Sequence, residues 1–419
     1  MEKEMSDNLV HLIEENSEDS FYIDLIQHDL DWHLYHFGNH LKNKSKRPIL
    51  DFYDLIQYVR GFISCLKGAL KQENSKIEKV LSIVPFSMDD VISSMGFVPY
   101  SLPVRARKTS IVVKSWRLLY YNFRFDYIVK RHSFSQIIHK DLKFIKRFYS
   151  FLKQYVLDNE FDYLYVRTDQ PFLERALLSI FKEANKPSFI FSHGIPADYN
   201  HYEDVLSTYV IVWGEKVKEN YIANGISPQK VHVVGNVKYK EPLHLSKIKW
   251  DDSSILVAPE SSIQGHHHSD PPELIDRNRV LVYLYEVEYI LKEKGYKHAI
   301  YRPHPSFNRK WIQDYVDPNF YTIDTAPLSE SAKKYSLVIG ATSSVMLEYC
   351  LMGVNCFVYE RKRDRLFPPF DGSDKRIPFA SSPYELKMLF EKHATVSTDF
   401  INDYIQPFDV VSLKRLMKQ

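Results

Sequence analysis

The sequence predicts an α/β protein made of two successive series of βα units, each forming a parallel sheet. Short runs rich in β-branched and aromatic residues alternate with stretches whose apolar residues recur at helical spacing. A polar stretch at 238–254 interrupts this alternation, which then begins again, and we interpret it as an interdomain linker. The length of 419 residues fits two to three domains of about 100–200 residues each.

The first series is expected to contain five strands, at 80–85, 163–167, 188–192, 209–213 and 231–234. A helix should follow the second of these strands, because apolar residues recur there at helical spacing from Phe172 to Phe181. Another helix is expected at 215–223. The glycine and proline in the segment 224–229 should stop that helix and begin a turn.

The second series is expected to place strands at 255–258, 299–302, 320–323, 337–339 and 356–359. Helices should lie between them, near 277–294, 308–315, 328–334 and 343–352. The tail at 383–419 has the pattern of two or three amphipathic helices. We therefore predict a first domain at 1–245, a second at 246–382, and C-terminal helices at 383–419 that pack back across both.

The first 150 residues show the alternation of strands and helices less clearly. A helix is expected at 51–71 and a strand at 21–26, whereas 101–150 reads as an insertion. Between Val104 and Arg147 there are twelve Lys or Arg and only two Asp, with aromatic residues interleaved. One interpretation is a patch for anionic lipid headgroups or an anionic polymer. The other is a solvated helix face whose aromatic residues point toward the core.

Composition and charge exclude several classes of protein. Hydrophobic residues make up 44% and charged residues 26%, as in a folded globular protein. The formal net charge of +2 gives no global indication of nucleic-acid binding. Three cysteines exclude a disulfide scaffold and favour reduced thiols. We find no signal-peptide pattern and no membrane-spanning run, and we expect a cytoplasmic protein.

In open parallel sheets, ligands bind beyond the carboxyl ends of the strands, so residues that directly follow strands are the candidates for a site. His193 follows the strand at 188–192 in a Ser-His-Gly-Ile-Pro turn and is a candidate general base; a structural histidine is the alternative. Asp169 follows the strand at 163–167. It is a candidate base or nucleophile, or else the N-cap of the next helix.

Two further strings point to phosphate binding. In Arg302-Pro303-His304-Pro305 the prolines fix the backbone, and Arg302 offers a fork suited to phosphate; a proline-rich loop is the alternative. The segment 339–345 joins a strand to a helix through small residues. Thr342, Ser343 and Ser344 add hydroxyl donors at a helix start that favours anions; helix capping alone is the alternative.

Glu260 follows the first strand of the second series and could contact a sugar or base, and Asp270 is a secondary candidate carboxylate. Three adjacent histidines at 266–268 lie between them. We interpret this segment as a polar loop, because no partner motif typical of a zinc site is present. The sequence also lacks GxGxxG, P-loop, GxSxG and kinase motifs, which argues against a dehydrogenase, an NTPase and a serine hydrolase.

The order of four motifs resembles the bacterial GT-B transferases that assemble surface polysaccharides. These motifs are HGxP at 193–196, VWGExVKExYxxxGIxxxKVxVxGNxKY at 212–239, RPHP at 302–305 and GxTSSVxxE at 340–348. Two branches share the layout: the CMP-sugar branch of sialyltransferase and Kdo-transferase type, and the CDP-glycerol and CDP-ribitol polyol-phosphate polymerases. The resemblance covers about residues 160–360. It implies a GT-B fold, in which two Rossmann-like domains face each other across a cleft.

The resemblance also implies roles for individual residues. His304 and Pro305 stand at the HP motif, where the histidine touches the nucleotide phosphate, and Ser343 and Ser344 stand at the SS motif that clamps it. His193 stands where the polyol-phosphate enzymes place a base. Asp169 lies about where CMP-sugar enzymes place an acidic base or nucleophile, although the surrounding letters match no motif.

One departure from the pattern favours the CMP-sugar branch. The polyol-phosphate enzymes usually read TDYSSV, whereas this chain reads GATSSV and lacks the Asp. We therefore expect metal-independent transfer of a Kdo-like or sialic-acid-like sugar from a CMP-activated donor, without a cofactor. The acceptor is expected to be a saccharide or lipid-linked saccharide of capsule or lipopolysaccharide assembly, with peripheral contact to the inner membrane. A CDP-polyol phosphotransferase and a non-catalytic saccharide-binding module are the alternatives.

Overall fold

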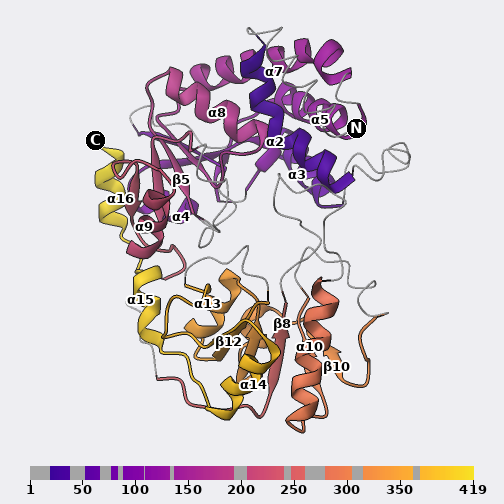
Figure 1. Cartoon of the computed structure of the whole chain (residues 1–419). Coiled ribbons are helices and arrows are strands. Elements are labelled where there is room, and N and C mark those ends of the chain that lie inside the picture. The colour runs from indigo at the N-terminus through magenta and orange to yellow at the C-terminus, as the bar shows by residue number, and fades with distance from the viewer. Residues whose placement is uncertain are drawn as a thin grey trace.

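The computed structural model describes eleven segments of the chain. They are 19–37, 52–66, 77–83, 88–107, 109–132, 136–192, 205–239, 247–259, 279–303, 315–361 and 369–419. Figure 1 shows that these segments form two α/β lobes, one above the other, and that the C-terminal helices run beside both.

The first lobe contains a seven-stranded sheet in the order β3-β2-β1-β4-β5-β6-β7. Every strand pair in it is parallel. The strands are β1 (Lys79–Ser82), β2 (Val98–Ser101), β3 (Ile111–Val112), β4 (Tyr163–Val166), β5 (Ser188–Phe191), β6 (Tyr209–Val212) and β7 (Val231–Val233).

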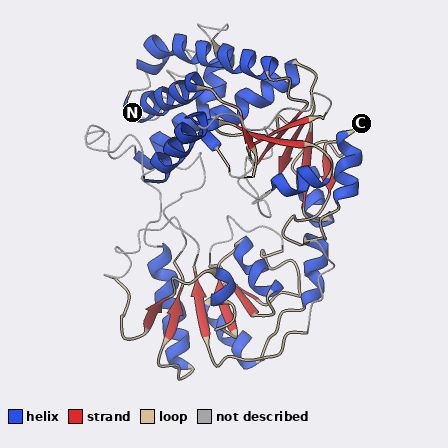
Figure 2. Ribbon diagram, turned by 180° about the vertical axis from the view of Figure 1, so that it is seen from behind, coloured by secondary structure: helices blue, strands red, loops and turns tan. Residues whose placement is uncertain are grey.

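The second lobe contains a six-stranded sheet in the order β10-β9-β8-β11-β12-β13, again with every pair parallel. Its strands are β8 (Ile255–Ala258), β9 (Ala299–Tyr301), β10 (Tyr321–Ile323), β11 (Leu337–Gly340), β12 (Asn355–Tyr359) and β13 (Phe379–Ala380). In Figure 2 these strands run toward the first lobe, so their carboxyl ends lie on the side that faces it.

Helices cover both faces of the first sheet, because successive strand residues point to opposite faces and both sets are apolar. In β1, Leu81 packs with one group of helices and Val80 with the other. The first group is α2 (Ser20–Phe37), α3 (Phe52–Leu66), α5 (Trp116–Arg131), α7 (Leu142–Asp158) and α8 (Phe172–Glu183). The second group is α4 (Met88–Ser94) and α16 (Val410–Met417).

The second sheet is enclosed in the same way. Val257 of β8 packs against α10 (Arg279–Glu293) and α14 (Pro383–Glu391), whereas Leu256 points to the other face. That other face is covered by α13 (Ser344–Leu351) and α15 (Ile401–Tyr404). The short helix α12 (Leu328–Ser331) lies between β10 and β11 in the chain.

One hydrophobic cluster joins the two lobes. It contains Val212 of β6 and Val217 of α9 (Glu215–Ala223) from the first lobe, together with Val338 of β11 from the second. Ile401 and Tyr404 of α15 belong to the same cluster, which places α15 between the lobes. The lobes therefore share a core and are not held together by a linker alone.

The tail also holds the first lobe through backbone contacts. The amide of Asn236 donates to the carbonyl of Gln406 at 3.0 Å, and the amide of Gln406 donates to that of Trp213 at 2.8 Å. Gly214 and Gly235 leave room for this approach: a Cβ at Gly214 would lie 2.5 Å from the carbonyl carbon of Tyr404. The turns that follow β6 and β7 thus fit closely around the returning chain.

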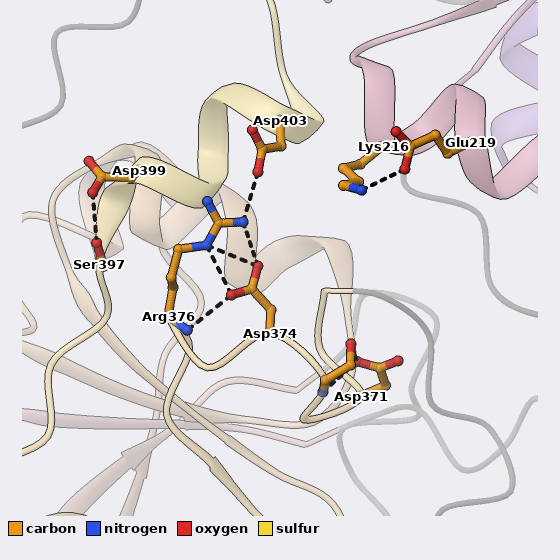
Figure 3. A network of polar contacts seen from close by, with 9 residues as sticks. Lys216, Glu219, Asp371, Asp374, Arg376, Ser397, Asp399 and Asp403 are labelled. Carbon is orange, nitrogen blue, oxygen red and sulfur yellow. Dashed lines mark hydrogen bonds and ion pairs between the residues drawn. The ribbon is translucent and has the colours of Figure 1, made fainter.

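A polar network fastens α15 to the second lobe (Figure 3). The guanidinium of Arg376 donates to Asp374 and to Asp403 of α15, at 2.7 Å in each case. The hydrogen bonds with Asp374 raise the pKa of Arg376 above its usual value. Lys216 of α9 pairs with Glu219 close to this network.

Most predicted elements are confirmed, with small shifts at their ends, from β4 to β12 and for the three C-terminal helices. The expected helix at 308–315 falls mainly outside the described residues. The strand predicted at 21–26 is wrong, because these residues lie in α2. Ile23, Ile26 and Leu30 are all buried and recur at helical spacing, and a window of six residues was too short to show this period.

The region at 101–150 is part of the first lobe: β3 is an edge strand of its sheet, and α5 and α7 help to cover that sheet. The expected domain boundary at 245/246 lies outside the described residues. The division of the chain into three parts stays a prediction.

Replacing Gly235 by Ala is expected to destabilise the protein more than replacing Gly225. Both residues have a left-handed backbone, with φ of +87° and +91°, so each alanine costs about 1–2 kcal/mol in strain. A Cβ at Gly235 would also lie 2.1 Å from the carbonyl oxygen of Pro407, whereas one at Gly225 would meet nothing within 4 Å. Thermal unfolding followed by circular dichroism compares the two. Equal decreases in Tm would contradict the close packing of the tail.

Candidate functional site

The carboxyl edge of the second sheet brings two predicted phosphate-binding segments to the end of the same strand. The amide of Arg302, just after β9, donates to the carbonyl of Val257 at 2.9 Å. The amide of Ala341, just after β11, donates to the carbonyl of Ala258 at 3.2 Å. Because Val257 and Ala258 end β8, Arg302 and the turn before α13 lie on either side of that strand.

Arg302 is held by one arm of its guanidinium. Nη1 donates to Asp324 Oδ2 at 2.7 Å and to the carbonyl oxygen of Ala326 at 2.9 Å. Within the described residues its side-chain hydrogen bonds all run through Nη1. The side chain of Arg302 is 21% exposed, whereas that of Asp324 is 5% exposed. The guanidinium is therefore fixed in place through Nη1, and no described residue accepts a hydrogen bond from Nε or Nη2.

Asp324 is the centre of a polar chain that leads from Arg302 to helix α13. Its carboxylate also accepts hydrogen bonds from the hydroxyl of Ser331 at 2.6 Å and from the amide of Ala326 at 3.0 Å. Burial by itself would raise the pKa of Asp324, but these hydrogen bonds and the Arg302 charge lower it overall. The hydroxyls of Ser331 and Tyr349, which belongs to α13, lie 3.2 Å apart.

The turn from β11 into α13 is built by small and hydroxyl-bearing residues. A Cβ at Gly340 would lie 2.3 Å from Met346 Sδ, so glycine lets the helix pack against the end of its strand. Thr342 donates to the carbonyl of Phe370 at 3.3 Å. Ser343 is the N-cap and accepts from the amide of Val345 at 3.4 Å. The capping alternative for Ser343 is thus observed, and it is compatible with anion binding at the same helix start.

Asp169 lies at the carboxyl edge of the first sheet, after β4. It is 5% exposed, and Oδ2 accepts from the amide of Leu206 at 3.1 Å. Its alternative interpretation as a helix cap is wrong, because α8 follows Pro171 and its first amide, that of Phe172, donates to Asp29 at 2.7 Å. Asp169 instead ties the end of β4 to the segment that leads into β6.

The remaining candidates lie outside the described residues: His193, Glu260, Asp270, His304 and Pro305. The backbone of Ser344 begins α13, but its side chain is also outside them. The structure therefore brings together Arg302, Thr342 and Ser343 at one edge, and it places Asp169 on the other sheet. The roles of all these residues stay predictions.

Sequence reasoning missed two polar residues that shape this edge. Asp324 directly follows the strand predicted at 320–323, so the rule that selected Arg302 also pointed to it. Ser331 had no comparable signal, because its partner is seven positions away in the chain.

In the first sheet, Ser82 ends β1 fully buried, and its hydroxyl has no hydrogen-bond partner among the described residues.

Two further features concern metals and membranes. Among the residues that the structure describes, no cluster of three or more His, Cys, Asp or Glu is arranged to bind a metal ion. The prediction of a metal-independent reaction remains a prediction. None of the described helices combines the length and apolar character needed to span a bilayer.

No protein-family model matches the sequence, and no curated protein matches it significantly. Solved structures do resemble the chain. The UDP-GlcNAc 2-epimerase of Methanocaldococcus jannaschii, in complex with UDP-GlcNAc and UDP, matches with a TM-score of 0.51 at 12% identity, covering 82% of this chain and 99% of that one. Acinetobacter baumannii MurG matches with a TM-score of 0.46 at 9% identity, covering 81% and 99%.

The likeness to the Methanocaldococcus structure extends over both lobes and shows the fold. The protein is an α/β protein of GT-B type, with two Rossmann-like units. This confirms the fold class expected from the sequence. An identity of 12% establishes the fold alone, so the activity is argued from the site.

Replacing Asp324 by Asn is expected to destabilise the second lobe by about 2 kcal/mol at neutral pH, because it disrupts a buried, charge-assisted set of hydrogen bonds. The folded-state pKa of Asp324 is lowered, so its stabilisation is present above the unfolded-state value and is lost as the pH falls through the folded-state value. The difference between wild type and variant should therefore shrink below about pH 4.

Urea unfolding at several pH values measures this difference. Asp399→Asn, which alters an exposed carboxylate of the tail, is the control and should change stability little. A difference between wild type and Asp324→Asn that stays constant through the acid range would contradict the proposed ion pair.

Proposed function

We propose that the protein is a nucleotide-sugar-dependent glycosyltransferase that holds the donor phosphate at the carboxyl edge of its second sheet. On this proposal the nucleotide lies on the part at 246–382, and the acceptor lies on the part at 1–245. The Methanocaldococcus structure of the same fold contains UDP-GlcNAc and UDP, which supports a nucleotide-sugar ligand for this chain.

The polar chain from Arg302 to α13 carries the proposal. Asp324 binds Arg302 and Ser331 at 2.7 and 2.6 Å, and Ser331 in turn meets Tyr349 of α13. A guanidinium and a helix start are two features that favour a phosphate. Here buried hydrogen bonds fix one relative to the other, so little reorganisation is needed when the ligand binds.

The proposed reaction is a displacement at the anomeric carbon of the donor sugar. The bond between the anomeric carbon and the nucleotide phosphate breaks, and a glycosidic bond forms to the acceptor hydroxyl. Arg302, the first amides of α13 and, on the resemblance, His304 stabilise the negative charge on the departing phosphate. The proton of the acceptor hydroxyl passes to a base, for which Asp169, His193 and Asp270 are the candidates. Attack by a carboxylate instead would give a covalent adduct and retention of configuration.

For the donor we propose a CMP-activated sugar acid of Kdo-like or sialic-acid-like type, because GATSSV lacks the aspartate of the polyol-phosphate pattern. The acceptor is a saccharide or lipid-linked saccharide of a bacterial surface polymer.

Replacing Arg302 by Lys is expected to weaken nucleotide binding about tenfold or more, since lysine keeps the charge but loses the fork. Isothermal titration with CMP, CDP, UDP and GDP measures the affinities and also ranks the bases. Lys297→Gln is the matched control. Lys297 is an exposed cation just before the first residue of β9, whereas Arg302 follows its last residue. Unchanged affinity in Arg302→Lys would remove Arg302 from the site, and tighter binding of UDP than of CMP would overturn the choice of donor.

Replacing Ser343 by Ala should lower both stability and affinity, because Ser343 caps α13 at the proposed phosphate position. Ser115→Ala is its control: Ser115 caps α5 in the first lobe, where it accepts from the amide of Leu118 at 3.1 Å. Each variant should lose about 1 kcal/mol of stability. Only Ser343→Ala should also bind the nucleotide more weakly, and equal affinities in the two variants would assign Ser343 to capping alone.

Product analysis tests the reaction itself. With a CMP-sugar donor, the product gains a sugar and no phosphorus; with a CDP-polyol donor, CMP is also released but phosphorus enters the product. Phosphorus in the product would therefore replace our proposal by the polyol-phosphate alternative. Saccharide binding without turnover of any activated donor would favour a non-catalytic module.

A further inference from the structure

Helices α3 and α5 expose an unusually apolar surface on the first lobe. From α3 it includes Phe62 at 52% and Leu66 at 63% exposure, and from α5 it includes Trp116 at 46% and Tyr120 at 55%. Its other members are Leu55, Val59, Ile63, Phe123 and Tyr127. We call these nine residues the aromatic face. The two helices lie together in the first lobe (Figure 1).

The aromatic face is continuous across the two helices. The ring centroids of Phe62 and Trp116 are 5.0 Å apart, and those of Tyr58 and Phe123 are 5.8 Å apart. Along α5, the exposed aromatic residues recur at 116, 120, 123 and 127, which is the spacing of one helix face. The opposite face, with Leu118 and Phe125, is buried in the core. Each helix thus packs into the core of the first lobe on one face, through Leu118 and Phe125 in α5 and Cys65 in α3, and exposes apolar side chains on another.

A row of cations borders the aromatic face, where α5 meets α7. Arg117 lies over the ring of Phe151 at 5.4 Å, and Arg124 lies over the ring of Phe144 at 5.0 Å. Arg147 lies between Phe144 and Phe151 at helical spacing along α7 and is exposed. Lys140, in the π-helical segment at Ile137–Asp141 that precedes α7, is also exposed. Helices α3 and α5 together carry two acids, Asp54 and Asp126, and Asp126 is half-buried and accepts from Tyr58 at 2.8 Å. They carry five cations, so the net charge of the two helices is positive: Arg60, Arg117, Arg124, Lys130 and Arg131.

We propose that this surface docks on an anionic lipid bilayer, with the aromatic face in the interfacial region and the cation row against lipid phosphates. Aromatic rings with polar edges favour the membrane interface, and exposed cations next to them add attraction to anionic headgroups. Charge alone would also suit a soluble anionic polymer. The aliphatic side chains of α3, such as Leu55, Val59 and Leu66, would gain nothing from such a polymer, but they would be removed from water by a bilayer.

For the basic and aromatic region between Val104 and Arg147, the sequence left two ligands open: anionic lipid headgroups and an anionic polymer. The proposal takes the lipid. It also adds α3 to the surface, which the sequence did not indicate. It does not depend on the proposed function, since none of its residues belongs to the candidate site.

Vesicle co-sedimentation of the full chain tests the proposal. We expect binding to phosphatidylcholine vesicles that contain phosphatidylglycerol, weaker binding to phosphatidylcholine alone, and a decrease in binding as salt is added. The double variant Phe62→Ser/Trp116→Ser should bind about tenfold more weakly or worse, because it removes two large side chains from the interface. Arg117→Gln/Arg124→Gln should lose about fivefold for each charge removed.

Matched controls come from the second lobe. Tyr289→Ser/Tyr384→Ser removes two aromatic side chains that are 61% and 71% exposed, on α10 and α14. Lys375→Gln/Lys392→Gln removes two exposed cations. Both controls should bind vesicles like the wild type, and circular dichroism confirms that every variant is folded.

Three results would overturn the proposal. The first is no binding of the wild type to anionic vesicles. The second is equal loss of binding in the surface variants and in their second-lobe controls. The third is binding to soluble polyphosphate, with the same dependence on Arg117 and Arg124, but not to vesicles.

Discussion

The parallel direction of all strands that the structure describes is the constraint on which the site depends. In each sheet, all carboxyl ends meet at one edge, so loops that are distant in the chain become neighbours there. Arg302 and the Thr342–Ser343 turn are about forty residues apart in sequence. The backbone amides of Arg302 and of Ala341, which directly precedes the turn, nevertheless both donate to the end of β8. The hydrogen bonds that link Asp324, Ser331 and Tyr349 then connect Arg302 to helix α13 and fix the position of one relative to the other.

The tail adds a second constraint, because it contacts both lobes and holds them together. Helix α15 belongs to the hydrophobic cluster that both lobes share, and Asp403 ties it to Arg376 of the second lobe. The residues that follow fit against Gly235 of the first lobe. On the proposed function, with the donor on the second sheet and the acceptor on the first, the two lobes must keep a defined relative position, and α15 contributes to it by contacting both.

The fold could be predicted from the sequence because short apolar runs and helical spacing leave few alternatives to parallel sheets. The strand expected at 21–26 failed because its six residues carry β-forming side chains within a longer helical period. Arg302 and Ser343 were found because they follow strands directly. Ser331 was missed because its bond to Asp324 depends on packing, and the exposure of Phe62 and Trp116 could not be predicted because burial depends on how helices are arranged.

The most direct test of the central claim is a crystal structure of the protein with its best-bound nucleotide. Our account predicts a phosphate that accepts hydrogen bonds from Arg302 and from the first amides of α13, with Arg302 still paired to Asp324. A nucleotide held on the first sheet, or one whose phosphates contact neither Arg302 nor the start of α13, would contradict it.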